Sequence, residues 1–425
     1  MRPTSRRGIY RSVAREMDTD VAVVGGGLAG SACALELARA GVGVVVVEKA
    51  AFPRDKPCGE GLLPHGLALL ERLGCGDLPE RCGGQPFVGI LYHCHGVVAR
   101  GDFESGGVGR GVRRRHLDAA MQARAQEAGA VLRHGSVDDV VVDGDGGTIM
   151  LADGSQLRAR LIVGADGPRS RVRHRLGLDG GTARRARYAI RRHFRLDAGS
   201  AMPDRVEVHV GGGHELYVTP CEPGVVGVAA LIEKSLMGAG QGAPAARLQA
   251  LIDGCPPLST RLAGASPIDE ALACGPLRVK SRSVWRGRAV LIGDAAGYVD
   301  AITGEGMSLA LQTAAFASEA LIQILGGAVV DDALSSYARR RARAFRDHAL
   351  LTMGLVELAR HPALAKRAIA RLAKDPALFS RLLAVNTGAR SLWSLGLKDA
   401  LKLAVGSRPV SAAAPTPPAL PATFS

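Results

Sequence analysis

The chain has 425 residues, of which 47% are hydrophobic and 4% are aromatic, and its formal net charge is +14. This length and composition allow two or three modest domains with substantial cores, while the few aromatic side chains and the dispersed arginines argue against a nucleic-acid partner. The eight cysteines form no C-x-x-C pair and the histidines show no metal-ligand spacing, so we expect reduced thiols, a cytoplasmic location and no metal.

The two ends of the chain differ from the rest in composition. Residues 1–17 are rich in arginine and lack the apolar segment of a secretory signal, which predicts a disordered arm, with Met17 as an alternative start. Residues 407–425 are rich in proline and predict a disordered tail. We expect no membrane span, because no apolar run reaches the roughly 18 residues that a bilayer requires.

The first folded segment reads as a strand, a glycine-rich turn, a helix and a second strand. The β-branched run 20–24 predicts a buried parallel strand, and residues 31–39 predict a helix that ends at Gly41. A second strand over 43–47 leads directly into Glu48. This βαβ pattern is typical of dinucleotide binding, because free N–H groups at the start of the helix attract a pyrophosphate.

The residues of the turn have predicted roles. Gly25 allows the tight turn, Gly27 lets the backbone approach a pyrophosphate, and Gly30 lets the helix pack on the strand. Glu48 follows the glycines by about 20 residues, where a carboxylate binds a ribose diol. The pattern by itself fits FAD and NAD equally. The cofactor-binding residues predicted from this unit are Gly25, Gly27, Leu28, Ala29, Gly30, Glu48 and Lys49.

A distinctive loop, Pro57-Cys58-Gly59-Glu60-Gly61-Leu62, follows this unit after a short connection. Its position predicts that it reaches the reactive end of the cofactor, which makes Cys58 and Glu60 candidate catalytic residues. The alternative is that the two glycines only form the loop while Cys58 is a small buried hydrophobic residue. The sequence leaves both interpretations open.

Two later stretches show the sequence pattern of a mixed β-sheet. Residues 87–100 and 188–231 alternate in polarity and are rich in turns. Within the second stretch, 205–210 and 215–220 read as antiparallel strands on either side of a triple-glycine turn.

Two further strand–turn signatures decide the nature of the dinucleotide. The strands 161–164 and 289–292 run into Asp166 and Asp294. Open α/β sheets bind ligands at the carboxyl ends of their strands, and a carboxylate there can accept a hydrogen bond from a ribityl hydroxyl. Together with the first turn, these signatures indicate a flavin site assembled from distant segments, and therefore an FAD-dependent oxidoreductase.

Glycines near residue 305 complete the predicted cofactor site. A long apolar helix from about Ser308 to Leu325 follows them. N–H groups at its start can face the electron-rich pyrimidine edge of a flavin. Gly304, Gly306 and Met307 are therefore predicted to bind the cofactor.

The three signatures resemble those of the para-hydroxybenzoate hydroxylase-like monooxygenases and geranylgeranyl reductases, over most of residues 18–330. The resemblance implies an α/β fold, in which a mixed β-sheet substrate domain is inserted into a Rossmann-like FAD-binding domain. It also implies that Asp294 contacts the ribityl chain and that Asp166 supports both FAD and transient NADPH. Arg114 falls in register with a flavin-contacting arginine, and Val137 lies where relatives often contact the adenine.

The same resemblance suggests how the substrate is held. Inward residues of the strand 215–219 would line a cavity over the flavin ring, and Tyr217 on it is a third candidate catalytic residue. The chain departs from many relatives in carrying Ala301-Ile302-Thr303 where they have a proline over the ring. The implied FAD-binding domain comprises 18–84, 110–182 and 275–330, and the implied substrate domain comprises 85–109 and 183–274.

A C-terminal region over 331–406 is predicted to be helical and basic. His361-Pro362 and Asp375-Pro376 mark the starts of two short helices. Two interpretations remain open for the arginines of this region: a peripheral contact with an anionic membrane, or a solvated face on helices that pack against the flavin domain, which we favour.

The most specific functional prediction is an NAD(P)H-dependent monooxygenase that uses molecular oxygen on an aromatic, polyketide-like or lipidic small molecule. No second G-x-G-x-x-G motif follows a strand, so the nicotinamide must visit the flavin site and leave. One alternative is a geranylgeranyl reductase-like enzyme that reduces prenyl double bonds, which the Cys58 loop favours. A flavin-dependent halogenase is disfavoured, because its Trp-x-Trp-x-Ile-Pro signature is missing. A flavoprotein without turnover is the remaining alternative.

Overall fold

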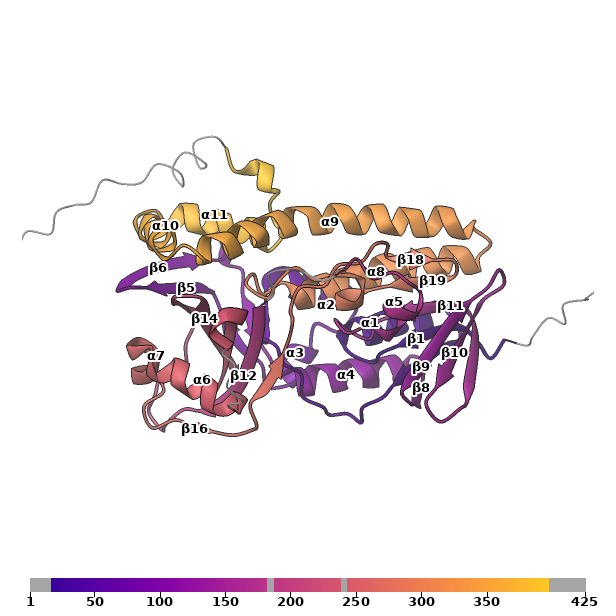
Figure 1. The fold of residues 1–425 in the computed structure, drawn as a ribbon, viewed down its shortest axis with the longest axis horizontal. Coiled ribbons are helices and arrows are strands. Elements are labelled where there is room, and N and C mark those ends of the chain that lie inside the picture. The colour runs from indigo at the N-terminus through magenta and orange to yellow at the C-terminus, as the bar shows by residue number, and fades with distance from the viewer. Residues whose placement is uncertain (1–16, 182–186, 238–242, 397–425) are drawn as a thin grey trace, which may run out of the picture.

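The computed structural model describes residues 17–181, 187–237 and 243–396. Figure 1 shows two sheet-based halves side by side, with the long helix α9 (Val330–Ala359) running along the top of the molecule. Nearly all of the predicted N-terminal arm, the predicted tail and the last part of the C-terminal region lie outside the described residues.

The first half is built on the predicted βαβ unit. β1 (Thr19–Val24) lies between β2 (Val44–Glu48) and β11 (Gln156–Gly164) and is parallel to both. β8 (Val131–His134) extends the sheet beside β2, and β19 (Ala289–Leu291) extends it beside β11. The three sequence signatures therefore meet at one edge of the sheet, where these strands end. The sheet is completed by the antiparallel strands β9 (Val137–Val142), β10 (Gly147–Leu151) and β18 (Trp285–Arg286).

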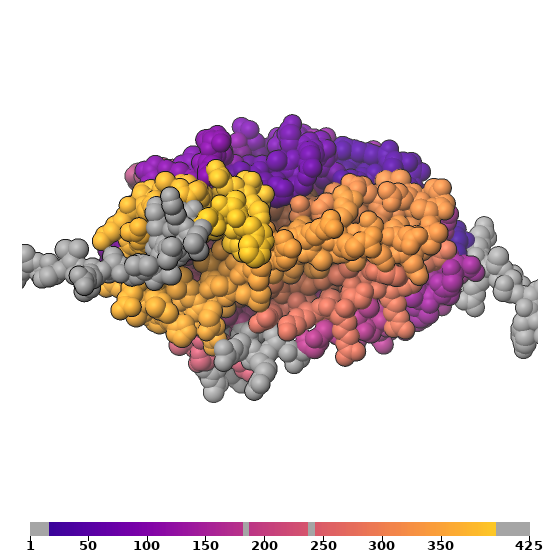
Figure 2. Space-filling model, turned by 90° about the horizontal axis from the view of Figure 1, so that it is seen from above, coloured from indigo at the N-terminus to yellow at the C-terminus, as the bar shows by residue number. Residues whose placement is uncertain are grey.

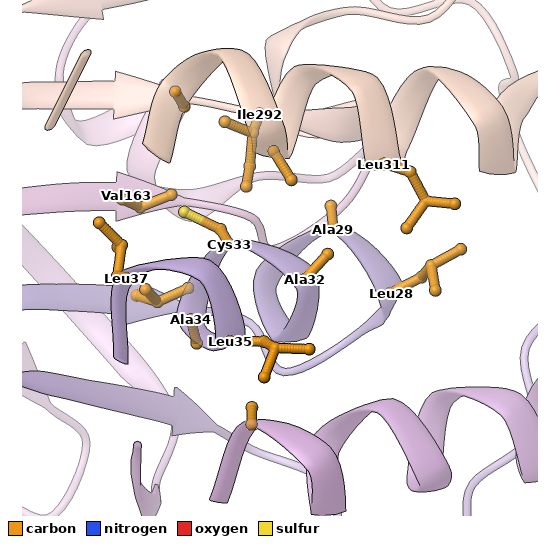
Figure 3. Packing of buried hydrophobic residues seen from close by; sticks show 14 of the residues in the cluster. Leu28, Ala29, Ala32, Cys33, Ala34, Leu35, Leu37, Val163, Ile292 and Leu311 are labelled. Atoms are coloured by element: carbon orange, nitrogen blue, oxygen red, sulfur yellow. The ribbon is translucent and has the colours of Figure 1, made fainter. Parts of the chain in front are cut away.

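Helices α1 (Leu28–Arg39), α4 (Arg114–Glu127) and α8 (Gly306–Leu325) pack together on one face of this sheet. Figure 3 shows the small and branched side chains of α1 against Val163 and Leu311. α1 begins at Leu28 rather than at the predicted Ser31, because the end of the glycine motif already forms its first turn. The β9–β10 pair continues the sheet from β11 and packs, together with α5 (Arg171–Arg175), against the opposite face of the parallel strands.

The second half is a mixed sheet with the strand order β16-β12-β15-β14-β13-β5-β6, and β17 also pairs with β12. The predicted antiparallel pair around the triple glycine is confirmed as β13 and β14. Helices α6 (Pro244–Asp253) and α7 (Pro256–Arg261) cover one face. The strands are β5 (Gly89–Cys94), β6 (Val97–Asp102), β12 (Arg187–Arg195), β13 (Val206–Val210), β14 (His214–Glu222), β15 (Val225–Glu233), β16 (Ser266–Pro267) and β17 (Leu272–Cys274).

A small sheet joins the two halves. Its order is β3 (Gly61–Leu62), β7 (Gly109–Gly111) and β4 (Gln85–Phe87), so the Cys58 loop leads directly into it. The short helices α2 (Pro64–Arg72) and α3 (Leu78–Arg81) follow this loop.

The C-terminal helices divide between the two halves. The start of α9 packs on α8, whereas α10 (Pro362–Lys374) and α11 (Pro376–Asn386) lie against β5 and β6 of the second sheet. Figure 2 shows that the segment from α9 to α11, in orange and yellow, covers one face of the molecule. The prolines begin α10 and α11 as predicted. We favoured an interpretation in which these helices pack against the flavin domain. The structure differs in part, because α9 packs on α8 of the first half, whereas α10 and α11 pack on the second sheet.

Helix α8 has 20 residues and is long and apolar enough to cross a bilayer, with a mean hydropathy of 1.3 over an 18-residue window. This contrasts with the expectation from sequence that no segment would qualify. More than half of the helix is buried, and it packs against both α1 and α9. Its apolar character is therefore accounted for by its place in the core.

Candidate active site

A cavity of about 680 Å³ extends from the carboxyl edge of the parallel sheet to the space between the second sheet and the C-terminal helices. All of the residues predicted to bind the cofactor or to act in catalysis border it, except Gly30. The bordering residues are Gly25, Gly27, Leu28, Ala29, Glu48, Lys49, Cys58, Glu60, Arg114, Val137, Asp166, Tyr217, Asp294, Gly304, Gly306 and Met307.

The glycine turn is shaped by close backbone packing. Gly25 has a φ of +103°, and a Cβ on it would lie 2.6 Å from the carbonyl oxygen of Ala165. A Cβ on Gly30 would lie 1.9 Å from the carbonyl oxygen of Gly25. The nearest atom to a Cβ on Gly27, at 3.3 Å, belongs to the flexible side chain of Arg54, and Gly27 itself borders the cavity. The turn thus combines tight packing with a helix start that borders the cavity, as a pyrophosphate site requires.

Glu48 is fixed at the end of β2. Its Oε2 accepts a hydrogen bond from Gly26 N at 2.7 Å, and its Oε1 accepts one from Ala50 N at 2.9 Å. Each carboxylate oxygen can accept a further hydrogen bond. The geometry therefore leaves Glu48 able to receive a ribose hydroxyl, as its position in the sequence predicts.

The two aspartates at the strand ends have different partners. Asp166 Oδ2 accepts hydrogen bonds from Arg171 N at 2.6 Å and Val172 N at 3.2 Å, while its Oδ1 is buried without a partner. Burial raises the pKa of Asp166. Asp294 forms an ion pair with Lys56 at 3.3 Å. An orphaned acceptor at the cavity wall suits a ligand that carries hydroxyl donors, so the residues present fit an FAD molecule.

Arg114 begins α4 at the cavity wall. Its guanidinium forms two hydrogen bonds with the buried carboxylate of Asp118, at 2.7 and 2.8 Å. Burial opposes the charge of Arg114, but the ion pair with Asp118 outweighs burial and raises its pKa. Arg114 is therefore a permanent cation held in one orientation.

The Cys58 loop directs the side chain of Glu60 into the protein interior, where it is buried. Glu60 has a φ of +60°, and its Oε1 accepts a hydrogen bond from Arg114 N at 2.9 Å. Its Oε2 lies 2.5 Å from Nε2 of His193, and Nδ1 of His193 lies 2.6 Å from Oδ2 of Asp269. Cys58 stays half-buried at the cavity wall, where its Sγ accepts a hydrogen bond from Glu60 N at 3.4 Å.

Three more charged residues join this chain of contacts. Arg113 and Arg191 contact Asp269 Oδ2 at 3.0 and 3.1 Å, and Arg191 also binds Asp55. The Glu60 cluster, as we call it, thus pairs three carboxylates with two arginines and one histidine, and it connects the loop to the surface. Its members are Asp55, Glu60, Arg113, Arg191, His193 and Asp269.

The Glu60 cluster shifts the titration of its members. Burial opposes the charge of His193, but hydrogen bonds with Asp269 and Glu60 raise its pKa. Burial likewise opposes the charge of Asp269, but its bonds with His193 lower its pKa to about 2. The arrangement therefore favours a protonated His193 between two carboxylates.

Tyr217 lies on β14 and faces the cavity. Its hydroxyl is 3.4 Å from the carbonyl oxygen of Ile302, and burial raises its pKa well above the ordinary value. Beside it, Glu215 and Asp300 both bind the buried Arg187, and burial raises the pKa of Glu215 to about 7. Tyr217 is therefore a neutral donor at the cavity wall.

The far end of the cavity is apolar. The second sheet contributes Ile90, Val206 and Val208 from β5 and β13. The C-terminal helices contribute the opposite wall, which consists of Leu351, Leu355, Leu358, Ala365, Ala368, Ile369, Leu372, Phe379, Leu382 and Leu383. A lining made of these apolar side chains suits a hydrocarbon chain.

Sequence reasoning missed two groups of residues at this site. The partners of Glu60 lie on β12 and before β17, and no local pattern connects them with the Cys58 loop. The apolar wall was missed because the C-terminal helices were considered only as a cover. The helical spacing of Leu351, Leu355 and Leu358 was the available signal, since it indicates one apolar face.

Two curated relatives match short parts of the chain. Menaquinone reductase of Mycobacterium tuberculosis is 60% identical over 57 residues, which are 13% of this chain and 14% of the relative. Squalene monooxygenase of Mus musculus is 36% identical over 104 residues, which are 24% of this chain and 17% of the relative. The matches thus span less than a fifth of either relative.

Solved structures share the fold over almost the whole chain. A flavoprotein/dehydrogenase from Cytophaga hutchinsonii superposes with a TM-score of 0.78 at 22% identity, covering 90% of this chain and 95% of the other. The flavin-dependent brominase Bmp2 superposes with a TM-score of 0.77 at 20% identity, covering 90% and 97%. The profile of the FAD binding domain family matches residues 18–349. The protein belongs to this family of FAD-dependent oxidoreductases.

Proposed function

We propose that this protein is an FAD-dependent monooxygenase whose substrate is an aromatic compound with a long apolar chain. The observation that carries the proposal is the single cavity, which joins the glycine turn to the apolar wall past Cys58 and Tyr217. Bound FAD would supply the redox chemistry. The apolar wall would hold the chain of the substrate, and the enclosed site would exclude water from the reacting atoms.

The residues of the site divide the work. The start of α1, which borders the cavity, and Arg114 would hold the negatively charged part of FAD, while Glu48 and Asp166 would accept hydrogen bonds from its hydroxyls. Tyr217 would exchange the hydrogen bond that it donates to the Ile302 carbonyl for one to the polar head of the substrate, because its raised pKa keeps the hydroxyl protonated. NAD(P)H would enter the same site transiently.

The test begins with the purified full chain, which is expected to be yellow. NADPH oxidation and oxygen uptake are then measured with phenols that carry alkyl chains of increasing length. The proposal expects uptake of oxygen to rise with chain length and the product to gain the mass of one oxygen atom. A chain that binds FAD but consumes no oxygen with any of these phenols contradicts the monooxygenase assignment.

A prenyl reductase is the second candidate, and the short match with menaquinone reductase favours it. Such an enzyme would add two hydrogens to an isoprenoid double bond. Assay without oxygen separates the two candidates, since only the reductase would then produce a product heavier by two mass units. Halogenation has less support, because the similarity to the brominase is a similarity of fold.

Replacing Asp294 with alanine is expected to weaken FAD binding by about 10- to 100-fold, the loss typical of a hydrogen bond to a charged group. Asp294 borders the cavity at the carboxyl end of the sheet. The FAD content is measured from the absorbance near 450 nm after gel filtration. Asp331→Ala, at an exposed position in α9, is the matched control and is expected to retain its FAD.

Narrowing the apolar wall is expected to change chain-length selectivity. Leu355→Trp adds bulk inside the cavity, so KM for long-chain phenols should rise about tenfold while short-chain phenols react as before. Ala342→Trp places the same side chain on an exposed turn of α9 and should leave both KM values unchanged. Equal KM increases for short and long chains would contradict the assignment of this wall to the substrate chain.

A further inference from the structure

A second group of chemistry-bearing side chains lies away from the cavity. On β13, Val206 and Val208 border the cavity, so Glu207 and His209 lie on the opposite face of the sheet. The parallel pairing of β5 with β13 aligns His93 with His209. The three side chains His93, Glu207 and His209 therefore meet on the face that α6 and α7 cover.

The three side chains are close together and largely buried. Each side chain offers one potential ligand atom, and these three atoms lie within 4.8 Å of one another. The rings of His93 and His209 are stacked with their centroids 4.5 Å apart. Only 4% of Glu207 and 4% of His209 is exposed to solvent.

Three of the four ring nitrogens of the two histidines are buried without a hydrogen-bond partner. These atoms are Nε2 of His93 and both ring nitrogens of His209. The distance from Nε2 of His209 to Oε2 of Glu207 is 3.6 Å, which is too long for a hydrogen bond. Buried polar atoms without partners are rare and costly, so the group calls for a bound species that accepts their lone pairs.

The geometry points to a binding site for a divalent transition-metal ion of the zinc class, with His93, Glu207 and His209 as ligands. Imidazole nitrogen and carboxylate oxygen are suitable ligands for Zn²⁺. Ligand atoms around a tetrahedral zinc ion lie about 3.3 Å apart, so binding would require the two stacked imidazole rings to rotate toward the ion. Water would take the fourth position.

Arg261 supports the site from outside. Its guanidinium binds Oε1 of Glu207, which leaves Oε2 free for the metal. Carboxylate ligands are commonly oriented by such outer hydrogen bonds. Because β5 and β13 come from distant parts of the chain, a bound ion would tie the two segments of the second sheet together. The expectation of no metal rested on spacing along the sequence, which cannot reveal this pairing of strands.

The test uses the full chain with its FAD. The protein is stripped with EDTA, incubated with Zn²⁺, freed of unbound metal by gel filtration, and assayed for zinc. We expect about one zinc ion per wild-type chain and almost none in His209→Gln or His93→Gln. His95→Gln is the matched control, since His95 is exposed next to the same strand and should leave zinc binding unchanged.

Two further measurements keep the result interpretable. The FAD absorbance and circular dichroism of each variant show whether it is folded, independently of any enzymatic activity. Saturating zinc should raise the Tm of the wild type but not that of His209→Gln, because a ligand stabilises only the state that binds it. A stripped wild type that takes up no zinc, or a folded His209→Gln that takes up as much as the wild type, overturns the inference.

Discussion

Gly30→Ala is expected to abolish FAD binding and to lower the free energy of unfolding by about 3 kcal/mol. A Cβ at this position would lie 1.9 Å from the carbonyl oxygen of Gly25, and neither backbone can move without separating α1 from β1. The start of α1, which we expect to bind the pyrophosphate of FAD, would move with it. The measurements are urea denaturation and the FAD content of the purified variant.

Gly354→Ala is the matched control for this experiment. Gly354 is exposed in the middle of α9, and a Cβ on it would have no atom within 4 Å. The same substitution is therefore expected to raise the free energy of unfolding by about 0.5–1 kcal/mol, because alanine favours a helix interior. If both variants changed stability equally, the close approach at Gly30 would not be the cause.

His193→Ala is expected to have the second large effect, a loss of about 3–5 kcal/mol in the free energy of unfolding. The substitution leaves Glu60 and Asp269 without the group between them, and Glu60 is only 1% exposed. Movement of Glu60 should also disturb the Cys58 loop, so kcat should fall more than FAD content. His361→Ala is the control, because His361 contacts Glu357 at an exposed position and should cost less than about 0.5 kcal/mol.

The Glu60 cluster also predicts how stability depends on pH. The pKa of His193 is raised in the folded protein, so its stabilisation is complete below its ordinary pKa of 6.5 and is lost as the pH rises through the folded value. The pKa of Asp269 is lowered to about 2, so its stabilisation is present above the ordinary 3.8 and is lost as the pH falls toward 2. Denaturation over a pH series should show the alkaline loss in the wild type, and His193→Ala should lack it.

The sequence predicted the elements whose signals are local. The strand, glycine turn and helix around Gly25 and Gly30 follow from short-range rules of backbone geometry, and the two Asp signatures fall at the ends of β11 and β19 for the same reason. The two prolines at the starts of α10 and α11 likewise predicted where these helices begin. These signals were sufficient to place the cofactor residues at one edge of a parallel sheet.

Contacts between distant segments could not be predicted in this way. His193 reaches Glu60 only because β12 and the Cys58 loop meet at the junction of the two halves. His93 and His209 become neighbours only through the pairing of β5 with β13. The spacing of Leu351, Leu355 and Leu358 indicates an apolar helix face, but it cannot identify the elements that this face meets.

The origin of the apolar wall has a consequence for how the protein can change. The segment from α9 to α11 supplies most of that wall, while the glycine turn and the aspartates come from the parallel sheet. Under the proposed function, the C-terminal helices would therefore determine which hydrocarbon chains bind, separately from the residues that would bind FAD. Substitutions in α9, α10 and α11 should therefore change the preferred chain length of the substrate. They should leave the glycine turn and the aspartates of the parallel sheet unchanged.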